Sequence, residues 1–202
     1  MSIILTERMV PVIMTVSGSP RKDGCSAEML RRFTHELDAA FVSYDAYGCR
    51  FAPCTDCRAC RQFEGCAMDD MDGFFADFEA CDGIVIASPI YNMSFPAPLK
   101  AIIDRMQRYY SARFFLGKRP PISKHRPVAL LLSAGSEDED GEFAARQLEK
   151  IFTVTNCELV CRIVRNDTDH FGSMEDIASE ISQEAAHFAN LSGSIINSSQ
   201  DF

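Results

Sequence analysis

The sequence lacks several features, and each absence excludes a class of protein. No stretch of about eighteen apolar residues occurs in the 202-residue chain, so no membrane-spanning helix is expected. Positive charge is scarce: 20 Lys and Arg stand against 29 Asp and Glu, and a net charge of −9 argues against a nucleic-acid partner. The first residues have neither the basic start nor the A-x-A site of a secretory signal, so we expect a cytoplasmic protein.

Nucleotide and phosphatase signatures are also missing. Neither G-x-G-x-x-G nor G-x-x-x-x-G-K-[ST] occurs in the chain. Cys25 and Arg31 have the C-x5-R spacing of a cysteine phosphatase, but the residues between them contain no glycine and are predicted to be helical. None of the four histidines lies beside a candidate nucleophile. Hydrolase chemistry is therefore not expected.

What the sequence does contain is a regular alternation of apolar and amphipathic segments. The apolar segments 10–16, 41–47, 83–87, 128–132 and 157–164 are predicted to be strands, and amphipathic helices are predicted between them. The last helix is predicted over 174–191. In the helix after Pro98, the apolar stripe runs from Leu99 to Tyr110. This alternation predicts one α/β domain with a mostly parallel sheet, whose ligands bind beyond the carboxyl ends of the strands.

The loop after the first predicted strand, SGSPRKDGCS at 17–26, has the composition of a phosphate-binding turn. Gly18 and Gly24 permit tight turning, and the following helix offers unpaired N–H groups and a partial positive charge at its start. Arg21 and Lys22 add full charges. From these residues alone, an ordinary Ser/Gly loop with a solvated basic pair is an equally good interpretation.

Four of the nine cysteines lie within thirteen residues, in the pattern C-x2-C-x2-C-x5-C. The compact spacing is similar to that of iron–sulfur ligation by thiolates. A four-thiolate zinc site is an alternative, although its usual form is two pairs separated by a longer loop. A reduced loop without metal is the third interpretation. In a cytoplasmic protein these cysteines are not expected to form a disulfide framework.

Taken together, the motifs resemble one known family. GSPRKDGCS (18–26), the four-cysteine motif followed by MDDM (68–71), and SPIYNMSFPAPLKAIIDR (88–105) are similar, in this order, to the NADPH-dependent FMN reductase family. They are most similar to its iron–sulfur flavoprotein branch. The resemblance implies a flavodoxin-like doubly wound sandwich with a five-stranded parallel sheet in the order 2-1-3-4-5. The expected organisation is a single flavodoxin-like FMN-binding domain over 1–202 with a cysteine-rich loop at 48–70. From its polar composition, the tail from about 192 is expected to be loosely ordered.

The resemblance also implies a set of site residues, with the chemistry carried by the flavin and no catalytic side chain. Those implied to bind the FMN phosphate are Ser19, Arg21, Lys22, Cys25 and Ser26. Those implied to contact the isoalloxazine ring are Pro89, Ile90, Tyr91, Asn92 and Met93, with Ser133, Ala134, Gly135 and Ser136 beside its pyrimidine end. The implied ligands of a [4Fe–4S] cluster, which air can destroy, are Cys54, Cys57, Cys60 and Cys66. Cys25 departs from the family pattern, because asparagine is usual there.

The implied activity is electron transfer from NAD(P)H through FMN to a small acceptor. An alternative is an electron carrier that exchanges electrons with a ferredoxin-type protein, and a weaker one is a zinc-stabilised module with another phosphorylated ligand. The resemblance further implies a homodimer or higher homo-oligomer. Lys100, Asp104 and Arg105 are interpreted as structural or interface charges rather than catalytic groups. The acidic residues 137–140 and Glu142 are interpreted as a solvated face, although crowding of the site by them would weaken NADPH binding.

Overall fold

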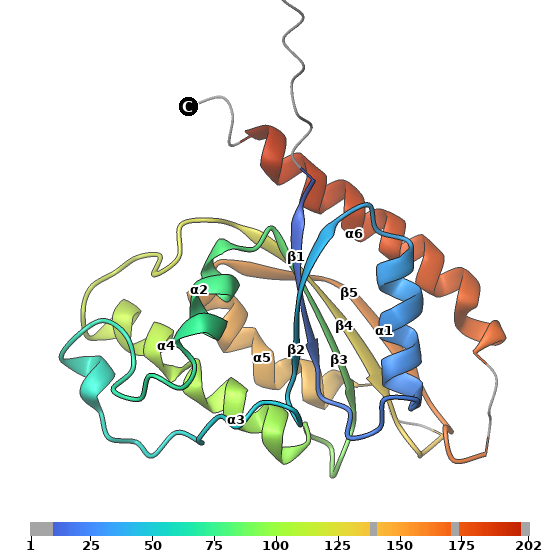
Figure 1. The fold of residues 1–202 in the computed structure, drawn as a ribbon, viewed down its shortest axis with the longest axis horizontal. Helices are drawn as coiled ribbons and strands as arrows, with labels where there is room; N and C mark the ends of the chain where they lie inside the picture. Colours follow the sequence, from blue (N-terminus) through green and yellow to red (C-terminus); the bar gives the residue numbers. More distant parts are fainter. Residues whose placement is uncertain (1–9, 138–140, 171–173, 199–202) are drawn as a thin grey trace, which may run out of the picture.

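Five parallel strands form one sheet in a computed structural model that describes residues 10–137, 141–170 and 174–198. The strands are β1 (Val12–Ser17), β2 (Ala40–Asp45), β3 (Gly83–Pro89), β4 (Arg126–Ser133) and β5 (Cys157–Arg165). Their order is β2-β1-β3-β4-β5 (Figure 1). The predicted order and the mostly parallel sheet are confirmed, and all five strands end at the same edge of the sheet.

Helices cover both faces of the sheet, as Figure 1 shows. On one face lie α1 (Cys25–His35) and α6 (Ala178–Ser198). On the other lie α2 (Asp72–Ala80), α3 (Ala97–Arg105), α4 (Gln107–Phe114) and α5 (Glu142–Thr155). Two short 3₁₀ turns, η1 (Ala59–Arg61) and η2 (Glu175–Ile177), complete the described part of the chain. Among the described residues no helix is both long and apolar enough to cross a bilayer.

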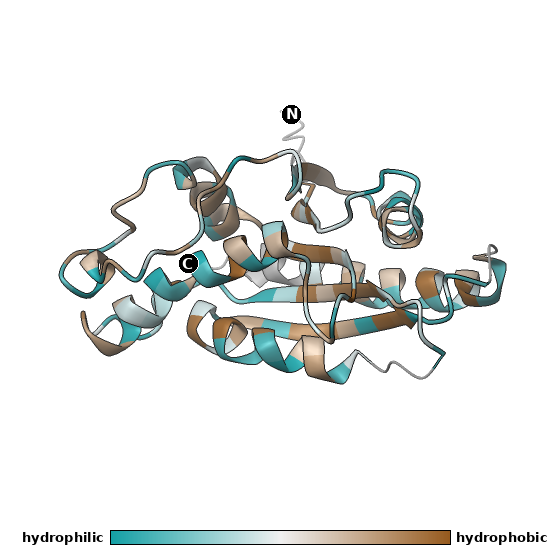
Figure 2. Ribbon diagram, turned by 90° about the horizontal axis from the view of Figure 1, so that it is seen from below, coloured by the Kyte–Doolittle hydropathy of each residue, from teal (hydrophilic) through white to brown (hydrophobic). Residues whose placement is uncertain are grey.

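The core consists of two apolar layers, one on each face of the sheet. Ile13 packs with Phe33 of α1 and Phe188 of α6, whose ring centroids are 5.7 Å apart. Met14, the next residue of β1, packs on the opposite face with Phe74 of α2. Burying one such side chain contributes about 1.5–3 kcal/mol. Figure 2 shows the apolar colouring concentrated along the central strands. With both faces covered, the strand ends are the place left for a ligand.

Two helices occupy the region where the apolar stripe predicts one. Helix α3 ends at Arg105 and α4 begins at Gln107, and at the break the Tyr109 N–H donates to the Met106 carbonyl (2.9 Å). This three-residue spacing is tighter than that of an α-helix and rotates the residues that follow. Tyr109 is therefore buried and Tyr110 exposed, so the prediction that Tyr110 faces the core was wrong.

Helix α6 continues past the point where the sequence predicts a loosely held tail. It extends to Ser198, and the buried Ser192 hydroxyl donates to the Phe188 carbonyl (2.7 Å). A serine inside a helix can satisfy its hydroxyl on the preceding turn, so polar composition alone does not mark the end of a helix. Residues 199–202 of the predicted tail lie outside the described residues.

Candidate functional site

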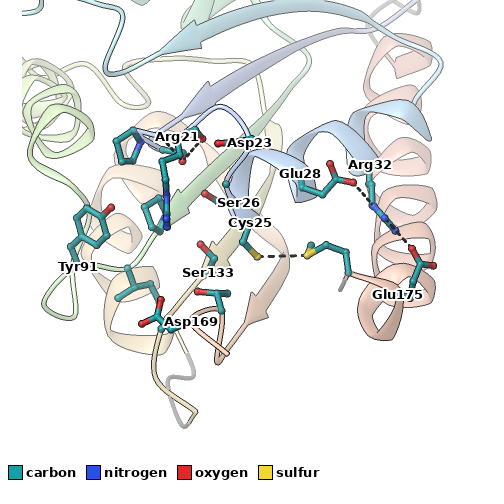
Figure 3. Close-up of a pocket in the computed structure, with 18 residues that line it drawn as sticks. Arg21, Asp23, Cys25, Ser26, Glu28, Arg32, Tyr91, Ser133, Asp169 and Glu175 are labelled. Carbon is teal, nitrogen blue, oxygen red and sulfur yellow. Dashed lines mark hydrogen bonds and ion pairs between the residues drawn. The ribbon is translucent and has the colours of Figure 1, made fainter. Parts of the chain in front are cut away.

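The loops at the carboxyl edge of the sheet enclose a cleft of about 860 Å³ (Figure 3). The segments that follow β1, β3, β4 and β5 all contribute to its walls. The predicted site residues that line it are Ser19, Arg21, Cys25, Ser26, Pro89, Ile90, Tyr91, Ser133 and Gly135. Three separate predicted loops therefore meet around one cavity, at the edge where parallel sheets bind their ligands.

Some predicted residues lie outside the cleft, and some of its walls were not predicted. The predicted residues that are not among its lining are Lys22, Asn92, Met93, Ala134 and Ser136. The lining residues that sequence reasoning missed are Pro20, Asp23, Gly24, Glu28, Arg32, Thr168, Asp169, Met174 and Glu175. The last four belong to the segment after β5. The rule that ligands bind beyond strand ends applies equally to β5 and could have indicated this segment.

The loop between β1 and α1 is shaped to hold an anion. Ser19 is buried, and its hydroxyl donates to the Arg21 carbonyl (2.8 Å) and accepts from the Arg21 N–H (3.2 Å). Gly24 is the N-cap residue of α1, and no side chain in the described part of the chain caps this helix end. The N–H groups of the first turn thus lie at the cleft with the positive end of the helix dipole. This arrangement suits a phosphate group.

Gly18 sets the position of this loop against the neighbouring strand. Its N–H donates to the Ala87 carbonyl (2.7 Å). A Cβ atom at this position would lie 2.6 Å from Cδ2 of Leu99 and 2.8 Å from Oγ of Ser88. Glycine thus lets the loop leave β1 close to β3 and α3 without displacing the side chains of Leu99 and Ser88.

The loop after β3 forms a tight turn that separates its residues into two groups. Tyr91 and Ser94 exchange backbone hydrogen bonds of 2.9 and 3.0 Å, while Asn92 and Met93 have φ values of 51° and 60°. Two consecutive positive φ angles are typical of the type I′ turn. Gln147 of α5 holds the turn by donating to the Met93 carbonyl (3.2 Å). Tyr91 consequently lines the cleft, whereas Asn92 and Met93 form the exposed tip of the turn.

The charges at the α1 side of the cleft are partly neutralised by one another. Arg32 donates to Glu28 (2.7 Å) and to Glu175 (3.1 Å), as the dashed lines in Figure 3 show. The hydrogen bond from Arg32 holds the pKa of Glu28 below its usual range. Among the acidic residues after β4, Glu142 pairs with Arg146 and Arg162 instead of facing the cleft. Residues 138–140 of that predicted acidic face lie outside the described residues.

Asp169 reaches the cleft because of a glycine on the neighbouring loop. A Cβ atom at Gly135 would lie 2.6 Å from Oδ2 of Asp169. The loop after β5 is tied to the loop after β4 by the Thr168 N–H and hydroxyl, both of which donate to the Ala134 carbonyl (3.0 and 3.1 Å). Ala134 therefore supports the cleft wall through its backbone rather than lining it.

Cys25 lies in the first turn of α1, where its thiol faces both the cleft and the loop before α6. Its Sγ atom is 3.6 Å from Sδ of Met174. Burial raises the pKa of the Cys25 thiol, and the nearby Arg165 opposes this only in part. At neutral pH the side chain is therefore a neutral thiol at the start of α1.

The four cysteines of the motif line a second, smaller recess of about 30 Å³ between their loop and the start of α4. Arg58, Arg61, Arg105 and Arg108 line the same recess. Cys54 and Cys57 are exposed, whereas Cys60 and Cys66 are half-buried, and the Cys60 thiol donates to Oγ of Ser111 (3.2 Å). As the side chains stand, no group of three or more His, Cys, Asp or Glu residues in the described ranges is placed to hold a metal ion.

Arg105 ties the ends of the cysteine loop to α3. Its guanidinium group donates to the carbonyls of Ala52 (2.9 Å) and Met68 (3.0 Å) and forms an ion pair with Asp70 (2.8 Å). The side chain is fully buried. The sequence interpretation of Arg105 as a structural charge agrees with this geometry, whereas Lys100 and Asp104 form an exposed pair. The Arg105 contacts span 53 and 37 residues of sequence, so no local pattern indicated them.

Thiol labelling of the reduced, metal-free protein is expected to follow this burial. At pH 8, iodoacetamide should modify Cys54 and Cys57 first, Cys60 and Cys66 more slowly, and Cys81 only on unfolding. Burial raises the pKa of Cys81 to about 11, so only about one molecule in a thousand carries its thiolate at pH 8. Peptide mass spectrometry over time measures the order. Labelling of native Cys81 as fast as Cys57 would contradict it.

Comparison with known proteins places these features in a family context. The family model described as NADPH-dependent FMN reductase matches residues 11–166. An iron–sulfur flavoprotein of Methanosarcina thermophila is 31% identical over 170 residues, which cover 80% of this chain and 81% of the relative. An FMN-dependent NADH:quinone oxidoreductase of Thiobacillus denitrificans is 26% identical over 205 residues, with 89% of this chain and 99% of the relative covered.

A solved structure has the same fold. The NAD(P)H:quinone oxidoreductase from Methanothermobacter marburgensis superimposes with a TM-score of 0.62 over 92% of this chain and 96% of that one. The two sequences are 20% identical, so this likeness bears on the fold alone.

Proposed function

Because the chain belongs to the NADPH-dependent FMN reductase family, we propose that its cleft binds FMN and that the protein passes electrons from a nicotinamide donor to an acceptor. The single observation that supports this best is the uncapped start of α1, which meets the loops after β3, β4 and β5 around one cleft. A flavin mononucleotide combines an anionic tail with a flat ring, and the cleft offers a place for each.

The residues of the first loop suit the phosphate. The N–H groups of the first α1 turn, the Ser26 hydroxyl and the Arg21 guanidinium are donors, and all belong to residues that line the cleft. A Cβ atom at Gly24 would meet Oγ of Ser19 and the carbonyl of Arg21 at 3.3 Å, so glycine keeps this cradle open. A phosphate group here would replace the missing helix cap.

The remaining walls suit a flat ring with polar edges. Pro89, Ile90 and Tyr91 offer an apolar surface next to the polar groups of Ser133 and the backbone of Gly135. When bound, FMN supplies two-electron exchange with nicotinamides and single-electron exchange with other redox groups. The chain's own part is to bind the ring, orient it and exclude water. Asp23 and Asp169 bring negative charge to this cleft, which disfavours an anionic nicotinamide nucleotide and limits its affinity.

We extend the proposal to a [4Fe–4S] cluster held by Cys54, Cys57, Cys60 and Cys66. Four thiols are the type and number of ligands that such a cluster takes. The arginines that line the recess would balance the negative charge of the thiolate ligands. In size the recess does not yet fit, since about 30 Å³ is roughly the volume of one water molecule. The exposed Cys54 and Cys57 would have to move outward to admit the cluster.

A second candidate function is that of an electron carrier with a protein partner of the ferredoxin type. The four-cysteine recess favours it, together with the similarity to a relative named iron–sulfur flavoprotein. We also propose that the protein works as a homodimer. Tyr91 of the cleft wall, Met93 of the same turn and Phe143 of the first turn of α5 expose 42%, 57% and 54% of their surface, and a second copy could cover them. The mass of the protein in solution would report this.

The function is tested by anaerobic purification in the presence of FMN, followed by absorption spectroscopy. We expect a yellow complex with about one FMN per chain, which NADPH or NADH bleaches within seconds. Bleaching by reduced ferredoxin but not by either nicotinamide would assign the carrier function instead. The absence of a stoichiometric FMN complex would overturn both.

A further inference from the structure

We propose that Arg105 is a positioning residue for the metal cluster: its guanidinium fixes both ends of the cysteine loop and directs a free N–H donor at the sulfur-rich recess. The inference rests on the proposed cluster, but its geometry lies entirely in this chain. Arg105 belongs to neither the motif C-x2-C-x2-C-x5-C nor the cleft.

Arg105 joins two distant points of the cysteine loop. The carbonyls of Ala52 and Met68 accept from different nitrogens of the same guanidinium, Nη1 (2.9 Å) and Nη2 (3.0 Å). All four cysteines of the motif lie between these two residues. Because the rigid, planar guanidinium group holds both ends of the cysteine loop, the loop can adopt fewer conformations.

A carboxylate completes this clamp, which consists of Arg105 and the two loop ends that it binds. Oδ1 of Asp70 pairs with Nη1 of Arg105 (2.8 Å), while its Oδ2 accepts from the Ala52 N–H (2.7 Å). Burial alone would raise the pKa of Asp70, but these partners hold it below its usual range. The carboxylate therefore remains charged at neutral pH, and Arg105, Asp70 and the two loop ends form one connected network.

One nitrogen of the Arg105 guanidinium, Nε, takes no part in this network. Nε of Arg105 is buried and has no hydrogen-bond partner within the described residues. A buried donor without an acceptor destabilises the fold unless a ligand satisfies it. The side chain lines the recess that contains the four thiols. Thiolate and sulfide sulfurs are the acceptors that a bound cluster would bring to this place.

The other arginines of the recess are held differently and provide the comparison. Arg108 lies over the Phe75 ring (4.3 Å from the centroid), and Arg61 lies over the Phe115 ring (4.5 Å). Neither donates to the backbone at the two ends of the loop, as far as the described residues go. Arg108→Lys is therefore the matched control for Arg105→Lys. Both substitutions keep the charge and remove a guanidinium group, but only Arg105→Lys removes the hydrogen bonds to the two loop ends and the buried, unpartnered Nε–H group.

The first test uses the reduced, metal-free protein and does not depend on a cluster. We expect Arg105→Lys to speed alkylation of the half-buried Cys60 and Cys66 at least about tenfold, because two hydrogen bonds from a charged donor no longer hold the loop closed. Arg108→Lys should change these rates less than about twofold. Equal rates in the two variants would overturn the clamp. If Arg105→Lys fails to fold, Asp70→Asn, at a partly exposed carboxylate, provides the same measurement.

The second test uses the protein with its cluster, loaded anaerobically. Arg105→Lys should lose iron to a chelator at least about tenfold faster than the wild type. Its cluster should also show a lower midpoint potential, because an N–H donor to sulfur stabilises the more negative, reduced form. Potentials that coincide in the wild type, Arg105→Lys and Arg108→Lys would overturn the assignment of Nε as a donor to sulfur. Wild-type protein that takes up no iron would refute the proposed cluster, while the alkylation rates still decide the clamp.

Discussion

Cys57→Ser is expected to remove the cluster and leave the flavin in place. Iron in the anaerobically loaded protein should fall from about four atoms per chain to less than about one, because each thiolate ligates one iron of the cluster and serine is a poor substitute. FMN content should stay within about a tenth of the wild-type value, since the cleft and the cysteine recess share no lining residue. Iron, zinc and flavin are measured on the same sample.

Cys49→Ser is the matched control for this experiment. Cys49 lies in the same predicted loop, 48–70, and is half-buried where Cys57 is exposed, but it does not line the recess. Its replacement should leave the iron content unchanged. If Cys57→Ser retains iron, or if both variants lose it equally, the four-cysteine ligand set is wrong. Zinc in place of iron in the wild type would assign the recess to a different metal.

A carboxylate at position 25 is expected to weaken FMN binding strongly. Cys25→Asp places a negative charge in the first turn of α1, beside the proposed phosphate position. Two like charges about 4 Å apart repel by about 4 kcal/mol at an effective dielectric constant of 20, and solvent in the open cleft weakens this. We therefore expect FMN affinity to fall at least about 100-fold. The helix itself should tolerate aspartate, because a carboxylate favours a helix N-terminus.

Cys25→Asn separates charge from shape, since asparagine and aspartate have nearly the same volume. Asparagine is usual at this position in the family, so this variant should bind FMN within about threefold of the wild type. Riboflavin, which has no phosphate, should bind both variants alike. Flavin fluorescence titration gives the dissociation constants of both ligands for the wild type and the two variants. If aspartate weakens riboflavin as much as FMN, the turn before α1 is not the phosphate site.

The contrast between Cys25 and Arg105 shows what kinds of residue can be predicted from the sequence. Cys25 follows a buried strand and a Gly-containing turn, so its place at the start of a helix can be predicted from neighbouring residues. Arg105 lies on an amphipathic helix and resembles any surface charge. Its burial depends on carbonyls 53 and 37 residues away in the sequence. No local pattern contains that information.

The cleft itself was partly predictable for the same reason. The loops after β1, β3 and β4 contain turn-forming glycine, proline and serine residues next to apolar strands, which makes them visible in the sequence. Asp169 lies in the loop after β5 and enters the cleft only because that loop folds over Gly135. The tips of turns are equally hard to predict: Asn92 and Met93 belong to the right loop but lie at its exposed end, because both adopt positive φ.

By itself, the sequence determined the alternation of strands and helices, the turn suited to a phosphate and the spacing of the four cysteines. These are properties of neighbouring residues, set by backbone geometry and by the burial of apolar side chains. Only the tertiary structure decided that the loop after β5 closes the cleft, that the helix after β3 breaks at Met106, and that Arg105 anchors the cysteine loop. Those outcomes depend on how segments distant in sequence pack together, because a buried charge finds its partners only once the chain has folded around it.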